Sequence, residues 1–344
     1  MTTVLSEPLS ESESETAPLP SLADVEQARR RIADVVVHTP LHRSEELSAK
    51  YQANVLLKRE DQQRIRSFKL RGALNKISQL NTAQRAKGIV CASAGNHSQG
   101  VAYSCAHLQI PATIYMPLKT PAQKVTQVKK HGGEWIRVVL SGENFDESYQ
   151  QALEFQQQSG AVFVHPFDDF DVICGQGTAA LEILEDAQSP IDFLLAPVGG
   201  GGLISGLSTV FKAQSPATTI IGVEPQHAAA LNVSLQLGAN TRLDSIDPFI
   251  DGAATLKAGE LGFVICQQKL DHIITVHEGE ACQALIELYQ QQAIVAELAG
   301  ALSIAALEKI KDDIRGKTIV CMLSGGNNDF YRFAEIQQRA QAYA

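Results

Sequence analysis

The length and composition of the chain indicate about two globular domains and argue against several classes of function. It has 344 residues, of which 44% are hydrophobic and 19% are charged, and a domain commonly holds ~100–200 residues. Its 29 basic and 38 acidic residues give a net charge of -9, and no basic cluster is interleaved with aromatic residues, so we expect no nucleic-acid partner. No apolar run reaches ~18 residues, so we expect no membrane span.

The cysteines and the N-terminal segment indicate a cytoplasmic protein. The 6 cysteines are scattered without a Cys-x-x-Cys pair, as expected for reduced thiols in the cytosol. Residues 1–21 are rich in Ser, Glu and Pro, and no basic residue precedes Arg29. This composition argues against a secretory signal or a transit peptide. We predict a disordered acidic tail over these residues.

The first predicted elements surround one lysine. Leu22–Val35 has apolar residues at helical spacing behind Ser21 as a cap, which predicts a helix. A short strand is predicted at Val55–Lys58, with an extended polar stretch after it, and a helix is predicted at Leu70–Leu80. Lys69 therefore lies at a junction between extended chain and helix.

Two series of alternating strands and helices follow. The first series predicts strands at Ile89–Ser93, Ala112–Met116, Glu134–Val139 and Ala161–His165, and helices at His97–Leu108, Pro121–His131 and Asn144–Gln158. The second predicts strands at Phe193–Val198, Thr219–Glu224, His272–Val276 and Thr318–Leu323, and helices at Gly177–Asp186, Leu203–Lys212, Glu278–Gln292 and Ala299–Ile310. The segment between residues 224 and 272 is predicted to be irregular. Such alternation indicates parallel sheets covered by helices.

Lys69 is a candidate reactive amine. A lysine attacks an aldehyde readily only when burial or a nearby cation lowers the pKa of its amine. Phe68 and Leu70 offer apolar surroundings, and Arg71 adds positive charge. Taken alone, the residue is equally compatible with a solvated lysine at the start of a helix.

Three further segments carry chemistry. Gly199–Gly202 directly follow a predicted strand and precede a helix, so their backbone N–H groups can converge on a phosphate at the positive end of that helix. The segment is neither a Walker loop nor a dinucleotide-binding motif, and alone it is also compatible with a flexible loop. Residues 93–97 precede another helix, and Ser324 ends the last predicted strand, where a serine alone could simply cap a glycine turn.

Residues 67–73, 93–97, 199–203 and 324–327 together resemble the four signature segments of the fold-type II pyridoxal-phosphate enzymes, most closely the threonine dehydratase (threonine deaminase) branch. The segments come in the family's order, and the resemblance extends over Leu22–Arg332. It implies an α/β fold of two open, mostly parallel βαβ domains. The large cofactor-binding domain is then formed by residues 22–81 and 167–344 and the small domain by residues 82–166, with the active site in the cleft between them.

The resemblance also implies a role for each matching residue. Lys69 holds pyridoxal 5'-phosphate covalently through its aldehyde, and Lys69 and Ser324 are the expected catalytic residues. The other expected cofactor contacts are Phe68, Asn96, Gly199, Gly200, Gly201, Gly202 and Leu203. The expected substrate contacts are Ser93, Ala94, Gly95, Asn96 and His97. A structural or carboxylate-facing role is favoured for His97 over a role as general base, because the freed lysine already supplies a base.

The reaction type depends on the residue that meets the pyridine nitrogen of the cofactor. A neutral hydroxyl at Ser324 makes a weaker electron sink than a carboxylate partner and favours prompt loss of a β-leaving group. Racemases of the family carry a serine at the position of Ala94, which cannot transfer a proton. The family's divalent-cation ligands match Glu224 and Ala230, so no metal is expected. Glu297, with a supporting role, is followed by leucine where the family has proline.

We therefore predict dehydration and deamination of L-threonine to 2-oxobutanoate and ammonia, as a first step of isoleucine biosynthesis, with L-serine as a secondary substrate. A serine or hydroxyaspartate dehydratase or a racemase of the same family is the enzymatic alternative. A non-catalytic phosphate-binding module is the alternative of another class, and it would be colourless where the enzyme would be yellow. Residues 165–167 and 250–253 are expected to line the side-chain pocket. The family leads us to expect a homodimer or homotetramer.

Overall fold

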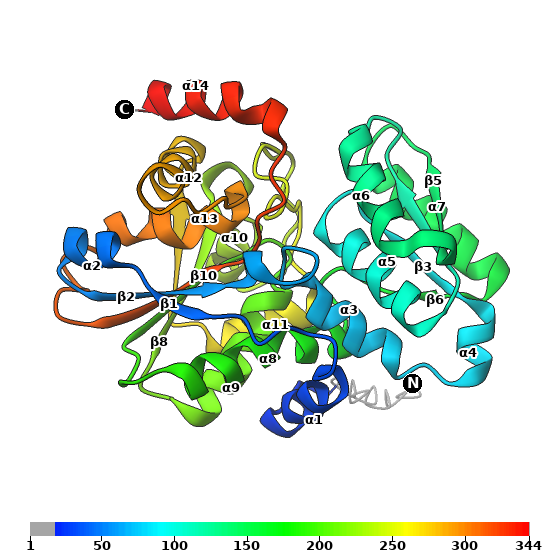
Figure 1. The fold of residues 1–344 in the computed structure, drawn as a ribbon, viewed down its shortest axis with the longest axis horizontal. Helices are drawn as coiled ribbons and strands as arrows, with labels where there is room; N and C mark the ends of the chain where they lie inside the picture. Colours follow the sequence, from blue (N-terminus) through cyan, green and yellow to red (C-terminus); the bar gives the residue numbers. More distant parts are fainter. Residues whose placement is uncertain (1–17, 344) are drawn as a thin grey trace, which may run out of the picture.

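The computed structural model describes residues 18–343, which form two α/β units (Figure 1). The predicted acidic tail falls almost entirely on residues 1–17, outside the described part. The first helix, α1 (Leu22–Ile32), begins as predicted behind Ser21, whose hydroxyl accepts a hydrogen bond from the backbone N–H of Asp24. Because the Asp24 carboxylate accepts in turn from the Ser21 backbone N–H, both residues form a capping box.

The smaller unit is a parallel sheet of four strands in the order β5-β4-β3-β6. Its strands are β3 (Ile89–Ala92), β4 (Ala112–Met116), β5 (Ile136–Leu140) and β6 (Val162–Phe163). Its helices are α5 (Asn96–Leu108), α6 (Ala122–Gly132) and α7 (Phe145–Ser159). The predicted series is confirmed, with β6 shorter than expected. All four strands lie within residues 89–163, and the exact domain boundaries at 81/82 and 166/167 stay predictions.

The larger unit is a sheet of six strands in the order β1-β2-β10-β7-β8-β9, in which only the edge strand β1 is antiparallel to its neighbour. The strands are β1 (Leu41–Arg43), β2 (Asn54–Arg59), β10 (Thr318–Leu323), β7 (Phe193–Pro197), β8 (Thr219–Pro225) and β9 (His272–Val276). The α/β class with mostly parallel sheets is therefore confirmed.

Helices cover both faces of the six-stranded sheet and enclose a separate apolar core on each (Figure 1). One face carries α1, α8 (Phe170–Asp186), α9 (Gly202–Gln214) and α11 (Glu260–Lys269). The other carries α2 (Glu45–Tyr51), α12 (Glu278–Gln292), α13 (Leu298–Ala305) and α14 (Phe333–Tyr343). The carboxyl ends of the five parallel strands consequently meet at one edge of the sheet, where ligands of open α/β sheets bind.

Helix α3 (Lys69–Ser78) joins the two units. It packs against α8 of the larger unit and against α5 of the smaller one. Ala73 and Ile77 belong to the core of the four-stranded sheet, whereas Leu70 and Leu74 pack on Ile32 of α1. The residue at the start of this helix is thus held by both units.

The prediction for α8 was wrong at its start, because the helix begins seven residues earlier than the predicted Gly177. Its glycines suggested a helix boundary, but they lie inside the helix and permit close packing. A Cβ atom on Gly175 would come within 2.5 Å of the Arg71 carbonyl oxygen of α3, and one on Gly177 within 2.8 Å of the Gly206 carbonyl oxygen of α9. The glycines that suggested a helix boundary therefore mark close contacts between helices.

Other differences concern short or weakly patterned segments. Sequence reasoning missed α2, α4 (Thr82–Lys87), α10 (Ala230–Leu237), α11 and α14. Helix α4 has no buried residue, so it lacks the apolar periodicity that predicts a helix. The extended stretch expected before Lys69 is instead a 3-10 turn at Glu60–Gln62 followed by Arg66 at φ 57°. The predicted helix Ala299–Ile310 ends as an α-helix at Ala305 and continues as 3-10.

Residues 18–343 bear on the expectations for membrane-spanning helices and for the cysteines. Within this range, no helix combines the length and the apolar character needed to cross a lipid bilayer. All 6 cysteines are buried free thiols, in agreement with the prediction of reduced thiols.

Candidate active site

The predicted site residues meet at the carboxyl edge of the six-stranded sheet. Strands β2, β10 and β7 are neighbours, and Ser324 and the glycine loop directly follow β10 and β7. Ser67 forms an antiparallel bridge with Gly325, and the Phe68 backbone N–H donates to the Ser324 carbonyl oxygen at 3.2 Å. The backbone therefore fixes the start of α3 beside Ser324, which is buried.

Lys69 is the first residue of α3 and is half-buried. Its Nζ donates to the Pro166 carbonyl oxygen at 2.7 Å and lies 5.2 Å from the centroid of the Phe68 ring. Burial lowers the pKa of the Lys69 amine to about 8, and the Glu297 carboxylate acts in the opposite direction. An amine with this pKa is a usable base and nucleophile near neutral pH.

The expectation that Arg71 lowers the pKa of Lys69 was wrong. The Arg71 guanidinium points to two carboxylates, Glu60 and Glu182, with which it forms ion pairs at 2.8 and 2.7 Å. Its charge is compensated there, and burial accounts for the lowered pKa of the amine. Lys69 and Arg71 are two positions apart on α3, and side chains at this spacing point to different sides of a helix.

The glycine loop is a packed structure that presents backbone donors. Gly201 has φ 90°, which favours glycine, and α9 begins at Gly202 without a side-chain cap on its first N–H groups. A Cβ atom on Gly200 would lie 2.2 Å from the Phe167 ring, and one on Gly199 would lie 3.1 Å from the Ala253 Cα. The flexible-loop alternative is thereby disfavoured, and the uncapped helix start can receive an anion.

The segments expected to line a side-chain pocket lie beside these residues. Pro166 contacts the Lys69 amine, and Phe167 and Ala253 pack on the glycine loop. His165 accepts a hydrogen bond from the Asp168 backbone N–H at 2.8 Å through Nδ1. Burial lowers the pKa of His165 to about 4, so this ring is neutral at physiological pH.

The loop at residues 93–96 brings the smaller unit into the site. Ser93, Ala94, Gly95 and Asn96 are half-buried between β3 and α5, and the Ser93 hydroxyl accepts from the Gly95 backbone N–H at 3.2 Å. The Asn96 side-chain amide donates to Glu297 Oε1 at 2.7 Å. This bond joins the smaller unit to the start of α13 in the larger one.

Glu297 and Asn327 complete a hydrogen-bonded group with Asn96. The Asn327 side chain donates to Asn96 Oδ1 at 2.8 Å, and its backbone N–H donates to Glu297 Oε2 at 3.0 Å. A Cβ atom on Gly325 would lie 2.7 Å from the Glu297 carboxylate, which explains the glycine there. Sequence reasoning gave Glu297 only a supporting role and assigned none to Asn327, although Asn327 belongs to the fourth motif.

Burial raises the pKa of the Glu297 carboxyl to about 7, and the hydrogen bond from Asn96 opposes this shift. A raised folded-state pKa stabilises the fold below the ordinary value of 4.5, and this contribution is lost as pH rises through about 7. We expect Glu297→Gln, which is neutral like the protonated acid, to remove this dependence. Relative to the variant, the wild type should lose about 1–3 kcal/mol of unfolding free energy across that interval.

The measurement for Glu297 is urea unfolding of the holoenzyme between about pH 5 and pH 8. Glu154→Gln, at an exposed carboxylate of α7, is the matched control and should keep the pH dependence of the wild type. Parallel stability–pH curves for the wild type and Glu297→Gln would contradict the prediction.

His97 is placed as a structural residue. Its ring is buried, and Nε2 lies 2.8 Å from the carbonyl oxygen of Val164, the residue after β6. Among residues 18–343, Nδ1 has no hydrogen-bond partner. Burial lowers the pKa of His97 to about 3, so the ring is neutral and poorly suited to serve as a base. The geometry supports the structural interpretation that the sequence favoured.

Glu224, at the position of a family cation ligand, uses its carboxylate differently. It is buried at the end of β8 and accepts from the backbone N–H groups of Leu231 and Asn232 at 2.9 and 2.7 Å. Burial raises its pKa to about 8, and the two backbone hydrogen bonds oppose the shift. Its two oxygens thus anchor the first turn of α10, next to Ala230.

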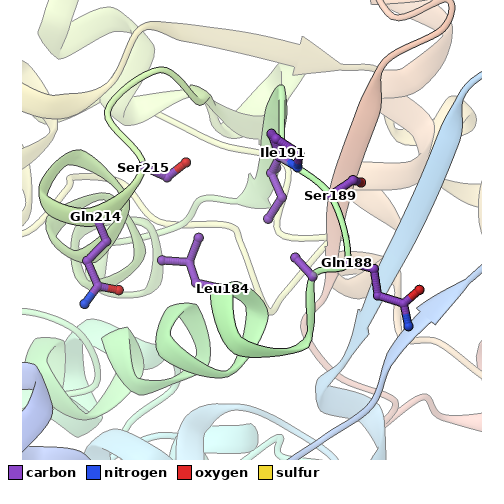
Figure 2. Close-up of a pocket in the computed structure, with 8 residues that line it drawn as sticks. Leu184, Gln188, Ser189, Ile191, Gln214 and Ser215 are labelled. Carbon is purple, nitrogen blue, oxygen red and sulfur yellow. The ribbon is translucent and has the colours of Figure 1, made fainter.

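A hollow at the opposite edge of the large sheet is unconnected with these residues. Figure 2 shows it between the end of α8, the start of β7 and the end of α9. Its lining includes Leu184, Gln188, Ile191 and Ser215. Since β7 begins just after this lining and ends at the glycine loop, the hollow and the site lie at the two ends of the strands.

Comparisons with known proteins agree with this geometry. A family model described as pyridoxal-phosphate dependent enzyme matches residues 32–325. The chain is 51% identical to the biosynthetic L-threonine dehydratase IlvA of Halalkalibacterium halodurans over 322 residues, which cover 94% of this chain and 78% of the relative. It is 51% identical to that of Bacillus subtilis, with coverages of 91% and 74%.

Solved structures show the same architecture. The processed form of threonine deaminase isoform 2 from Solanum lycopersicum superposes with a TM-score of 0.88 at 39% identity, over 94% of this chain and 95% of that one. Maize serine racemase superposes with a TM-score of 0.86 at 31% identity, over 94% and 98% of the two chains.

Proposed function

Because the chain belongs to the family of pyridoxal-phosphate-dependent enzymes, we propose that it is an ammonia-lyase that converts L-threonine to 2-oxobutanoate and ammonia. The observation that carries this proposal is the 51% identity with biosynthetic L-threonine dehydratases over more than nine-tenths of the chain. A first step of isoleucine biosynthesis is the corresponding role, with L-serine as a secondary substrate.

The residues present fit pyridoxal 5'-phosphate. Lys69 supplies an amine of lowered pKa for the aldehyde, and Gly199–Gly202 present an uncapped helix start for the phosphate. Ser324, directly after β10, would be a neutral partner for the ring nitrogen. The Asn96 amide, one N–H of which donates to Glu297, would be the donor for the ring hydroxyl. Phe68 and Leu203 contribute apolar surface beside the amine and behind the glycine loop. Bound pyridoxal phosphate supplies the electron sink for the α-carbon of an amino acid.

The chain's own groups then carry the proton transfers and the binding. The Lys69 amine takes the α-proton, for which a pKa of about 8 is suitable. The substrate carboxylate binds at residues 93–97, where the positive end of the α5 dipole favours an anion. A neutral Ser324 would not hold a proton on the ring nitrogen, which favours prompt loss of the β-hydroxyl. The hydroxyl would leave as water, with the proton that the Lys69 amine has taken from the α-carbon.

Racemisation is the main alternative to elimination, since maize serine racemase has the same fold at 31% identity. A racemase needs a second proton donor on the opposite face of the α-carbon. Ala94, in the loop before α5, offers no such group. We therefore assign elimination to this chain and exclude racemisation as its main reaction.

The test is a panel of L-threonine, L-serine, L-3-hydroxyaspartate and D-serine, with ammonia and keto acid measured for each. We expect the highest kcat/KM for L-threonine, a lower value for L-serine and no D-serine formed from L-serine. A preference for serine or hydroxyaspartate, or formation of D-serine, would assign the chain to another branch of the family. A colourless protein without turnover would support the phosphate-binding module instead.

Two finer points belong to the same proposal. A cytoplasmic location is supported by the 6 buried free cysteines, which are typical of a reducing compartment. Assembly as a homodimer or homotetramer is supported by exposed aromatic residues near the C-terminal helix, Phe330 and Tyr331. Size-exclusion chromatography with light scattering measures this assembly directly.

A further inference from the structure

A second cluster of ligand-type side chains lies at the same edge of the large sheet, beyond the site described above. His227 lies in a 3-10 turn (Gln226–Ala228) that directly follows β8, and His277 directly follows β9. Glu278 is the first residue of α12. Each residue offers one ligand atom, and these atoms all lie within 4.8 Å of one another.

The carboxylate of this cluster is oriented in advance. Glu278 is buried, and its Oε1 accepts from the His227 backbone N–H at 3.1 Å. Its other oxygen lies 2.6 Å from His227 Nδ1. A ligand carboxylate held by a backbone donor is the arrangement that fixes the ligands of many metal sites.

The two imidazole rings lie close together on the accessible side of the carboxylate. Their centroids are 5.5 Å apart, and the His227 side chain is exposed. His277 Nδ1 accepts from the Gly279 backbone N–H at 3.0 Å, and the ring stacks on Tyr343 with centroids 4.8 Å apart. An ion therefore has access from solvent past His227. Because a neutral imidazole has one lone pair, ligation by His277 would replace the hydrogen bond that its Nδ1 accepts from the Gly279 backbone N–H.

The donor set selects the kind of ion. Two imidazoles and one carboxylate suit Zn²⁺ and similar transition metals, whereas Mg²⁺ prefers oxygen ligands only. Bonds of ~2.0–2.1 Å in a tetrahedral site place ligand atoms roughly 3.3–3.5 Å apart. The spread of up to 4.8 Å thus requires ring movements of about one to two ångströms, within reach of an exposed histidine. The neighbouring Glu224 is not a member of this cluster.

We propose that His227, His277 and Glu278 form a Zn²⁺-type site that ties the ends of β8 and β9 to the start of α12. The fourth position is left to solvent. Bound metal would connect two segments 50 residues apart in sequence and would stabilise the larger unit without touching Lys69. The alternative is an ordinary ion pair between His227 and Glu278 at the start of α12, without a metal.

The test titrates Zn²⁺ into the holoenzyme and follows thermal unfolding and competition with a chromogenic chelator. We expect one histidine-dependent ion per chain and a rise of the unfolding midpoint by about 2–4 °C at saturation. His227→Gln and His277→Gln should each weaken Zn²⁺ binding at least about 10-fold, since even the loss of a residue that only supports a metal ligand has an effect of this size. Turnover without added metal should stay as in the wild type, because neither residue contacts the active-site group.

Controls separate this site from unspecific binding. His42→Gln, at an exposed histidine of β1, should bind Zn²⁺ like the wild type, and Mg²⁺ should cause no comparable shift. Co²⁺ bound to the wild type should show a visible ligand-field spectrum that His227→Gln loses. Equal Zn²⁺ affinity in the wild type and both cluster variants would overturn the proposal, as would a Co²⁺ spectrum that is absent or unchanged.

Discussion

Replacing Lys69 with alanine should lower kcat/KM on L-threonine by at least about 10³-fold, because the same amine serves as covalent anchor and as base. The chain places this amine at the start of α3, half-buried, with a pKa of about 8. Removing it leaves the glycine loop and Ser324 in place, so the cofactor can still bind but has lost its attachment. Steady-state kinetics and borohydride reduction followed by peptide mapping measure both losses.

Two further variants show whether the loss of activity is due to the missing primary amine, to the missing positive charge or to the loss of any lysine. Lys69→Arg keeps a cation at the site but cannot attach an aldehyde, so it should be as inactive as the alanine variant. Lys130→Ala, at an exposed lysine of α6, should retain the turnover of the wild type. If Lys69→Ala kept more than about one-tenth of the wild-type turnover, the covalent role would be wrong.

Arg71→Met should lower the unfolding free energy by about 3–5 kcal/mol, because it leaves buried carboxylates without their main partner. The Arg71 guanidinium donates to both oxygens of Glu60 and to both oxygens of Glu182 at 2.7–2.9 Å. Lys58 is the second cation of this buried group, 2.7 Å from Glu182, and its amine also donates to the Thr39 carbonyl oxygen. The positive charges of Arg71 and Lys58 thus compensate the negative charges of Glu60 and Glu182, and removing Arg71 leaves one buried negative charge uncompensated.

The control for Arg71 is an ion pair that also uses a glutamate of α8 but lies in solvent. Arg29 of α1 pairs with Glu185 through both guanidinium nitrogens, and both side chains are exposed. Arg29→Met should cost only about 0–1 kcal/mol, as is usual for surface pairs. Chemical denaturation of all three proteins measures the difference. A loss below about 1 kcal/mol for Arg71→Met would mean that water or a repacked side chain compensates the carboxylates.

Much of the fold could be predicted because its strands are continuous apolar runs between glycines and helices. His272–Val276 and Thr318–Leu323 occupy the predicted residues. Thr318–Leu323 is buried along its whole length, and a parallel strand covered on both faces leaves an unbroken hydrophobic signal. Helices α2, α4 and α10 were missed because they have 6–8 residues, too few for a period of 3.6 to be recognised.

The site could be predicted only as far as its motifs are contiguous. Lys69, Asn96, Ser324 and the glycine loop each lie in a segment of recognisable order. The link from Asn96 to Glu297 spans 201 residues and the link from Asn96 to Asn327 spans 231, and nothing in the local sequence indicates which partners will meet. The partners of Arg71 were missed for the same reason, because Glu60 and Glu182 approach it only after α3 and α8 have packed.

The close contact of α3, α8 and α9 limits how this protein can be engineered. Exchanging a helical glycine for alanine is a common route to higher heat resistance, since it reduces the freedom of the unfolded chain. At Gly175 and Gly177 the added methyl groups would collide with carbonyl oxygens at 2.5 and 2.8 Å. Pushing these helices apart would move the lysine that begins α3. Attempts at thermostabilisation should therefore leave this glycine seam untouched and start from exposed helices such as α7.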